Sequence, residues 1–202
     1  MANTNSTTRF DILRHGEPDG EDCFRGSGID HPISELGSQQ MRAAIAQNTQ
    51  WDLIISSPLI RCLDFAQKLS SELKLQLIID DSFREIGFGV WEGKTKEDVQ
   101  CNDSDTYKRF IIDPVKNRPA GAEPLEKFSN RVWHKLEELS TEYKGKRILL
   151  VSHAGVIRVV TARTMGLALN DVYNQLKVEY AATISCQFND KGRARLVLPS
   201  SL

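Results

Sequence analysis

The chain has 202 residues, of which 40% are hydrophobic and 26% charged, a composition typical of a single globular domain. Its formal net charge at pH 7 is −1, so it lacks the overall basic field with which proteins bind nucleic acid or acidic membrane surfaces. Any anion must therefore be bound by a local cluster of residues.

Four cysteines are scattered without a CxxC spacing: Cys23, Cys62, Cys101 and Cys186. This distribution argues against a zinc site and against a disulfide framework, and the apolar neighbours of Cys62 and Cys186 predict buried thiols. Residues 1–8 lack the features of a signal peptide and are expected to be flexible, and no apolar run approaches the roughly 18 residues of a membrane span. We therefore expect one domain over residues 1–202, located in the cytoplasm, with no membrane or nucleic-acid partner.

The first predicted strand covers the apolar run 10–13 and ends at Arg14-His15-Gly16-Glu17. In open α/β sheets, ligands bind at the carboxyl ends of the strands. An arginine fork matches the oxygens of a phosphate or carboxylate, and a neutral imidazole can act as nucleophile or base. In the loop 19–32 that follows, Arg25 either adds a charge to this site or is simply solvated.

A second strand and helix repeat this arrangement. Ser34 is expected to cap a helix that runs to Ile45, and a buried strand over 51–56 follows. Ser57-Pro58 then leads into a helix whose first turn contains Arg61. This turn lies at the same predicted sheet edge, where the free amides of a helix start already favour an anion.

A third strand over 75–79 leads into the loop 80–93, which has three glycines and three aromatic residues. Such surroundings tend to raise the proton affinity of a carboxyl, so Glu85 in this loop would suit a general acid, with a solvated loop glutamate as the alternative. The polar stretch 94–117 predicts a short helical excursion or lid.

The strongest strand of the chain is the aliphatic run 147–151, which ends at Ser152-His153-Ala154-Gly155 before a helix over 156–165. A long helix with an apolar stripe precedes this strand, and His134 lies off the stripe, where we expect no role for it. The segments 181–188 and 193–198 flank Asn189-Asp190-Lys191-Gly192 and predict a hairpin. The predicted fold is α/β with three layers: a mostly parallel central sheet, helices on both faces and an antiparallel edge.

If the strands are parallel neighbours, their ends bring two arginines and two histidines to one pocket: Arg14, His15, Arg61 and His153. These groups can surround a phosphate dianion, and the backbone amides of Ala154 and Gly155 can add donors. The motifs contain no carboxylate cluster for a metal, which favours a covalent route without cofactors. A histidine would attack phosphorus, a carboxylic acid would protonate the leaving oxygen, and water would then break the P–N bond.

Four motifs, in this order along the chain, resemble those of the histidine phosphatase, or phosphoglycerate mutase-like, superfamily. They are Leu13-Arg14-His15-Gly16-Glu17, Ser56-Ser57-Pro58 with Arg61, Glu85 before Phe88-Gly89-Val90-Trp91-Glu92-Gly93, and Val151-Ser152-His153-Ala154-Gly155-Val156. The resemblance implies that His15 is the phosphorylated nucleophile, that Glu85 is the proton donor, and that Arg14, Arg61 and His153 form the phosphate clamp. The Phe-Gly-x-Trp-Glu-Gly stretch is most similar to bacterial α-ribazole phosphatases of cobalamin biosynthesis.

The expected function is hydrolysis of a small phosphorylated metabolite, with Ala154 and Arg25 as additional substrate contacts. The loop from Glu17 to Phe24 is short, acidic and without the asparagine of the related mutases, which favours hydrolysis over mutase activity. A phosphoglycerate mutase or a sugar-phosphate phosphatase of the same superfamily is the alternative. A non-catalytic phospho-ligand sensor is a rival from another class. A P-loop ending at Gly93-Lys94-Thr95 fails on spacing, because its first glycine would fall at Phe88. The substrate and the oligomeric state are not encoded in a readable pattern.

Overall fold

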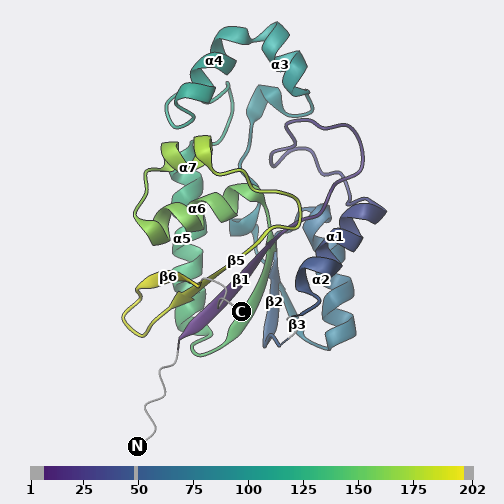
Figure 1. Cartoon of the computed structure of the whole chain (residues 1–202), viewed down its shortest axis with the longest axis vertical. Coiled ribbons are helices and arrows are strands. Elements are labelled where there is room, and N and C mark those ends of the chain that lie inside the picture. The colour runs from purple at the N-terminus through teal and green to yellow at the C-terminus, as the bar shows by residue number, and fades with distance from the viewer. Residues whose placement is uncertain (1–6, 48–49, 198–202) are drawn as a thin grey trace, which may run out of the picture.

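A computed structural model describes residues 7–47 and 50–197, whose strands form one sheet in the order β3-β2-β4-β1-β5-β6 (Figure 1). The strands are β1 (Thr8–Arg14), β2 (Leu53–Ser56), β3 (Gln76–Ile79), β4 (Arg147–Ser152), β5 (Thr183–Phe188) and β6 (Ala194–Val197). The first four are parallel, whereas β5 runs antiparallel to β1 and β6 antiparallel to β5. The predicted antiparallel edge is confirmed.

The register of the parallel strands aligns their carboxyl ends. Arg14 of β1 lies opposite Ser152 of β4, and Val151 of β4 lies opposite Ser56 of β2. The residues that follow these three strands therefore emerge side by side, as the site requires.

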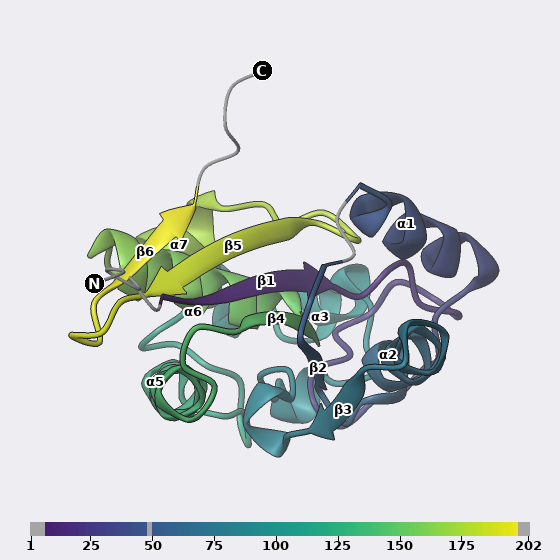
Figure 2. The same ribbon diagram turned by 90° about the horizontal axis from the view of Figure 1, so that it is seen from below.

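Helices cover both faces of the sheet (Figure 2). Side chains alternate along a strand, so Phe10 and Ile12 pack with α5 (Leu125–Glu142) and α6 (Ala154–Met165) on one face. Leu13 points to the other face and packs with residues of α1 (Glu35–Ile45) and α2 (Ile60–Leu73). The three-layer prediction is confirmed, and the two apolar cores fix the sheet between its helices.

The predicted excursion consists of α3 (Lys96–Asn102) and α4 (Ser104–Ile112), which lie beyond the carboxyl edge of the sheet (Figure 1). A small core of Trp91, Val99 and Tyr107 joins the two helices to the loop after β3. This loop contains two short 3-10 turns, η1 (Asp81–Phe83) and η2 (Gly89–Trp91). The helix α7 (Leu169–Gln175) was not predicted, because seven residues are too few to show a clear helical period.

Several predicted boundaries differ from the structure. Of the segment expected to be flexible, residues 1–6 lie outside the described residues, whereas Thr8 is buried and begins β1. The strand expected from residue 181 begins at Thr183, because Ala181 has a φ of 56° and donates its N–H to the carbonyl of His15. The helix expected from residue 156 already begins at Ala154. The predicted end of the last strand, Leu198, lies outside the described residues.

Cys62 and Cys186 are fully buried free thiols, as predicted. His134 is exposed on α5. Across residues 7–47 and 50–197, the structure contains no helix that is both long enough and apolar enough to span a membrane.

Candidate active site

His15 immediately follows β1 and is held there by its backbone. Its N–H donates to the carbonyl of Ser152, and its own carbonyl accepts from Ala181. The ring nitrogen Nδ1 lies 2.8 Å from the carbonyl oxygen of Gly16, an acceptor, so Nδ1 carries the proton and Nε2 keeps its lone pair. Burial, followed by the charges of Arg61 and Arg14, holds the pKa of His15 well below its ordinary value. The ring is therefore neutral, and nucleophilic at Nε2, near pH 7.

Arg14, the last residue of β1, is fixed from two sides. Its Nη1 donates to the carbonyl of Val178, and its Cζ lies 4.1 Å from the ring centroid of Tyr180. Burial lowers the pKa of this guanidinium, although an arginine remains charged. Its Nε is buried and has no hydrogen-bond partner in the part of the chain that the structure describes.

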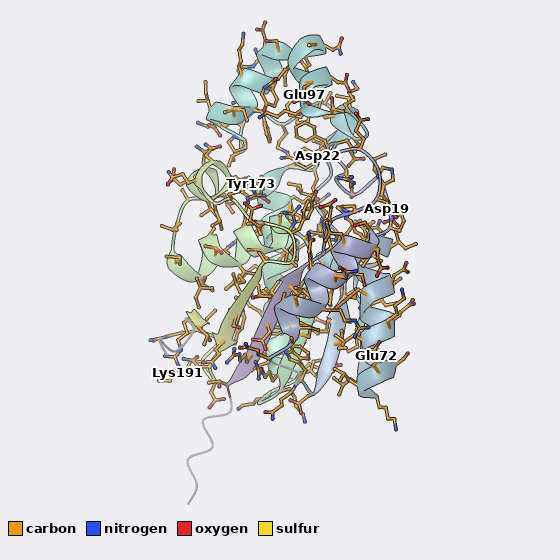
Figure 3. The ribbon with its side chains drawn as sticks, turned by 45° about the vertical axis from the view of Figure 1, so that its right-hand side comes forward. Asp19, Asp22, Glu72, Glu97, Tyr173 and Lys191 are labelled. Carbon is orange, nitrogen blue, oxygen red and sulfur yellow. The ribbon has the colours of Figure 1, made fainter. Side chains whose placement is uncertain are left out.

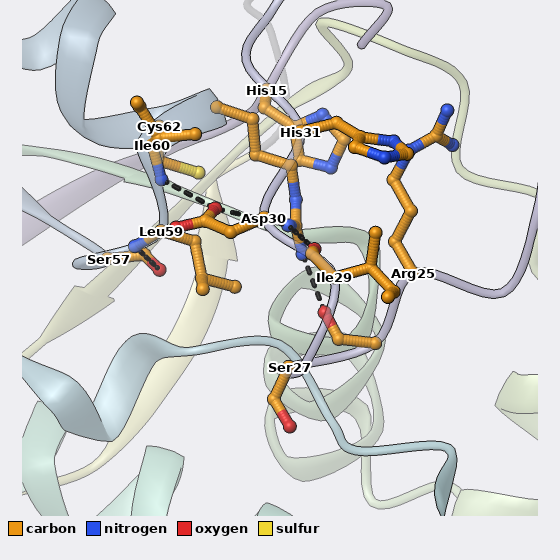
Figure 4. A network of polar contacts seen from close by, with 12 residues as sticks. His15, Arg25, Ser27, Ile29, Asp30, His31, Ser57, Leu59, Ile60 and Cys62 are labelled. Carbon is orange, nitrogen blue, oxygen red and sulfur yellow. Dashed lines mark hydrogen bonds and ion pairs between the residues drawn. The ribbon is translucent and has the colours of Figure 1, made fainter. Parts of the chain in front are cut away.

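Arg61, in the first turn of α2, is only 1% exposed and is held by the loop that follows β1. Figure 4 shows Ile29 and Asp30 of this loop beside Ile60 at the start of α2. Its Nη1 donates to the carbonyl of Ile29 at 2.9 Å, and its Nη2 to that of Gly26 at 2.7 Å. Asp30 of the same loop accepts the N–H of Ile60 at 2.8 Å and so ties the loop to the start of α2. The Nε of Arg61 is buried and, among residues 7–47 and 50–197, unpartnered.

The loop that holds Arg61 is itself braced by Glu92. One carboxylate oxygen of Glu92 accepts the N–H groups of Ser27 at 3.0 Å and of Phe88 at 2.9 Å. This carboxylate therefore joins the loop after β1 to the loop after β3. Glu92 belongs to the segment 89–95, whose end resembles a P-loop. This segment begins with the 3-10 turn η2, whereas a P-loop follows a strand.

His153 follows β4 and is completely buried. Its Nε2 lies 2.7 Å from Oγ of Ser57, and its ring meets that of His15 edge to face, with centroids 5.3 Å apart. Burial, and next the charge of Arg61, holds the pKa of His153 well below its ordinary value. Ser57 was predicted only as part of a motif. Its contact with His153, 96 positions away, has no signal in the sequence.

Glu85 lies at the start of α6, where both of its carboxylate oxygens accept backbone N–H groups. Oε2 accepts from Gly155 at 3.2 Å, and Oε1 accepts from Ile86 at 2.9 Å. A Cβ on Gly155 would lie 2.2 Å from Oε1, so only glycine leaves room for the carboxylate here. In this structure the Gly155 amide donates to Glu85, so its donation to a phosphate stays a prediction. Ala154 begins α6 directly before it, and its contact with substrate stays a prediction.

A pocket of about 160 Å³ opens where these groups meet. Its walls combine the predicted charged residues with three aromatic rings: Arg14, His15, Arg25, Arg61, Glu85, Phe24, Phe88 and Tyr180. Arg25 donates to the carbonyl of Glu21 at 2.7 Å, so it is anchored on the wall rather than solvated. His153 does not line the pocket and contacts it through the ring of His15. The place of Tyr180 in the pocket was not predicted, because this residue lies in a stretch without a motif.

The family model of the histidine phosphatase superfamily, branch 1, matches residues 10–199. The chain belongs to this superfamily. This match confirms the membership expected from the motifs around His15 and His153.

Three relatives of known name resemble this chain over nearly its whole length. A bifunctional protein of Mycobacterium tuberculosis is 28% identical over 195 residues, covering 95% of this chain but 53% of its own length, so the chain spans about half of that relative. The adenosylcobalamin/alpha-ribazole phosphatase of Escherichia coli is 26% identical and covers 95% of this chain and 96% of its own. The structure of a mycobacterial glucosyl-3-phosphoglycerate phosphatase superimposes with a TM-score of 0.83 at 25% identity, covering 97% and 100% of the two chains.

The last two relatives are phosphatases by name, and the superposition on the second confirms the predicted phosphoglycerate mutase-like fold. They also differ in the substrates they are named for, so the class does not identify a substrate. Across the described residues, no group of three or more histidine, cysteine, aspartate or glutamate side chains is arranged to hold a metal ion.

Proposed function

We propose that this protein hydrolyses small phosphomonoesters without a metal, through a phosphohistidine formed on His15. The observation that supports this most directly is the hydrogen bond of His15, which keeps the proton on Nδ1 and leaves the lone pair of Nε2 available to attack phosphorus. Burial also lowers the pKa of the ring, which favours its neutral form. Two buried guanidiniums, Arg14 and Arg61, lie on the same pocket, and the Nε of each has no hydrogen-bond partner among the described residues. They can take the oxygens of a phosphoryl group as it approaches Nε2.

In the first step, Nε2 of His15 forms a bond to phosphorus while the P–O bond to the alcohol breaks. Protonated Glu85 gives its proton to the leaving oxygen, and the alcohol departs neutral. In the second step, the Glu85 carboxylate takes a proton from water as that water attacks phosphorus and the P–N bond breaks. Arg14 and Arg61 stabilise charge on the phosphoryl oxygens in both steps, and His153 supports His15 from the buried side.

The physiological substrate is a small phosphorylated metabolite, and α-ribazole 5′-phosphate is the specific candidate that the sequence favours. The E. coli relative supports this candidate through its name. The mycobacterial phosphatase, named for a phosphoglycerate derivative, supports a sugar or glycerate phosphate equally well. We keep hydrolysis ahead of a mutase reaction because of the short acidic loop between Glu17 and Phe24, and the cytoplasm remains the proposed location.

The test is turnover of p-nitrophenyl phosphate in the presence of a chelator, together with trapping of the intermediate. The enzyme should remain active with EDTA, and acid-labile, base-stable phosphate should become attached to the protein from a radiolabelled substrate. Substituting His15→Asn should abolish the label and lower kcat by at least about 10³-fold. The matched variant His134→Asn, changed at an exposed ring on α5, should keep both.

Two outcomes would contradict the proposal. Tight binding of inorganic phosphate with no turnover at any pH would favour a sensor. Magnesium-dependent hydrolysis of ATP that survives the His15→Asn substitution would instead favour the P-loop alternative.

A further inference from the structure

One aromatic ring of the pocket wall, that of Tyr180, lies against two of the groups assigned to phosphoryl transfer. Its ring centroid is 4.1 Å from Cζ of Arg14 and 5.9 Å from the ring centroid of His15. Asp22, which lines the same pocket, lies between the carboxyl edge of the sheet and the α3–α4 excursion (Figure 3). Tyr180 reaches this edge from the segment between α7 and β5. Neither the motifs nor the proposed phosphoryl transfer gives this ring a role.

The segment from Val178 to Ala182 is attached to the end of β1 by three hydrogen bonds. Nη1 and the backbone N–H of Arg14 donate to the carbonyls of Val178 and Ala182, the second over 2.9 Å. The N–H of Ala181 donates to the carbonyl of His15 at 3.2 Å. Ala181 has a φ of 56°, in the left-handed region, which persists for a non-glycine residue only where surrounding contacts hold it. The tyrosine ring that this segment carries is therefore presented in one fixed position.

The Tyr180 ring covers the guanidinium of Arg14 from one side. A cation placed over an aromatic ring is attracted by the negative charge of the ring face, and this attraction fixes its position. Because Arg14 is half-buried, water weakens the attraction less than at an exposed site. Nη1 is directed to a carbonyl of the same segment, whereas Nε is buried and has no hydrogen-bond partner among the described residues. The contacts of Arg14 thus leave its Nε for a phosphoryl oxygen.

We propose that Tyr180 is a positioning residue, whose ring face holds the Arg14 guanidinium in the orientation in which Nε meets the phosphoryl group beside His15. This inference rests on the proposed function, because it takes Arg14 as part of the phosphate clamp. The ring acts through its face and not through its hydroxyl, so phenylalanine should replace it and an aliphatic side chain should not. Since Arg14 contacts the phosphoryl group, the effect should be the same for good and poor leaving groups.

The test compares Tyr180→Phe, which keeps the ring face, with Tyr180→Leu, which removes it. The leucine variant should lower kcat/KM by about 5- to 30-fold for both p-nitrophenyl phosphate and an alkyl phosphate, whereas the phenylalanine variant should stay within about threefold of the wild type. The inhibition constant of vanadate, a mimic of the transferring phosphoryl group, should rise by a similar factor in the leucine variant only. The control Tyr143→Leu, at the end of α5 beside the start of β1, should change neither quantity.

A double-mutant cycle separates positioning from a general effect on the fold. If Tyr180 acts through Arg14, the Tyr180→Leu substitution should cost less than about twofold in kcat/KM once Arg14→Gln has been made. Losses that multiply in the double variant would overturn the proposal, because they would show that the ring acts independently of the guanidinium. A Tyr180→Phe variant as impaired as Tyr180→Leu would also overturn it, since the hydroxyl would then be the group that matters.

If Tyr180→Leu does not fold, pentafluorophenylalanine at position 180 decides, because its ring keeps the shape of phenylalanine but loses the negative face. Activity equal to that of Tyr180→Phe would then overturn the proposal. Failure of the wild-type protein to hydrolyse p-nitrophenyl phosphate would refute the proposed function instead. Calorimetry with inorganic phosphate still tests the positioning in that case: the Kd should rise by about 5- to 30-fold in the variant without the negative ring face, and an unchanged Kd would overturn it.

Discussion

The chemistry of His15 depends on one hydrogen bond and on the burial of its ring. The carbonyl of Gly16 accepts a hydrogen bond from Nδ1–H, so the lone pair is on Nε2. Burial and two neighbouring guanidiniums disfavour the imidazolium and lower the pKa of the ring. In the same way Gly155, by lacking a side chain, leaves room for the Glu85 carboxylate at the start of α6. Each reactive group is thus prepared by a neighbour that does not itself react.

At this scale, the role of Glu85 can be tested by changing the leaving group. Substituting Glu85→Gln removes the proposed proton donor and should lower kcat for an alkyl phosphate by about 10²- to 10⁴-fold. For p-nitrophenyl phosphate, whose leaving group needs no proton, the loss should stay within about tenfold. Steady-state kinetics on both substrates would show the difference. Equal losses would remove Glu85 from the acid role.

Among the elements, the loops after β1 and β3 act as one unit. Carbonyls of Gly26 and Ile29 in the first loop hold Arg61, and Glu92 in the second loop holds the N–H of Ser27. The small core around Trp91 attaches α3 and α4 to this unit. The position of the Arg61 guanidinium therefore depends on backbone groups of the first loop and on the carboxylate that ties this loop to the second.

Substituting Glu92→Ala should loosen this unit. Two backbone N–H groups lose a charged acceptor, so the free energy of unfolding should fall by about 1–3 kcal/mol, and KM for p-nitrophenyl phosphate should rise as Arg61 loses its fixed position. Urea unfolding followed by tryptophan fluorescence, with parallel kinetics, measures both effects. The exposed Glu97→Ala, in the same stretch of chain, is the matched control. An unchanged KM in a destabilised variant would show that Arg61 is held independently.

For the molecule as a whole, strand order is what assembles the site. The ends of β2, β4 and β1 are neighbours in the sheet although they come from residues 56, 152 and 14. The same arrangement buries His15 and His153 beside Arg61, and both rings have a pKa well below the ordinary value. The free energy of unfolding therefore falls at acidic pH, because both rings take up protons in the unfolded chain but not in the folded protein.

This proton uptake predicts how stability varies with pH. Because the unfolded chain binds more protons than the folded protein below about pH 6.5, the contribution of each ring is complete above that pH and is lost as the pH falls. Between pH 7.5 and 5.5, the free energy of unfolding should drop by about 1.4 kcal/mol for each buried imidazole. Urea titrations at the two pH values give this difference. Substituting His153→Gln should reduce the drop by one such step, and an unchanged drop would contradict the assignment.

The sequence alone predicted the elements and residues whose signals are local. Apolar or alternating runs predicted all the strands of the described sheet, and the motifs predicted the family. The strand ends predicted that Arg14, His15, Arg61 and His153 share a pocket; the first three line it, whereas His153 lies behind the ring of His15. The hairpin at Asn189 was also readable, because its turn residues adjoin it in the chain.

Only the tertiary structure decided the contacts between distant residues. It pairs His153 with Ser57, gives the Gly155 amide to Glu85, places Tyr180 on Arg14, and brings Arg118 behind Phe88. Such contacts carry no periodicity or motif, because they depend on which side chains the packed sheet, helices and loops bring within a few ångströms of one another. Hydrophobic pattern determines where a strand or helix forms, whereas packing determines what its polar side chains meet.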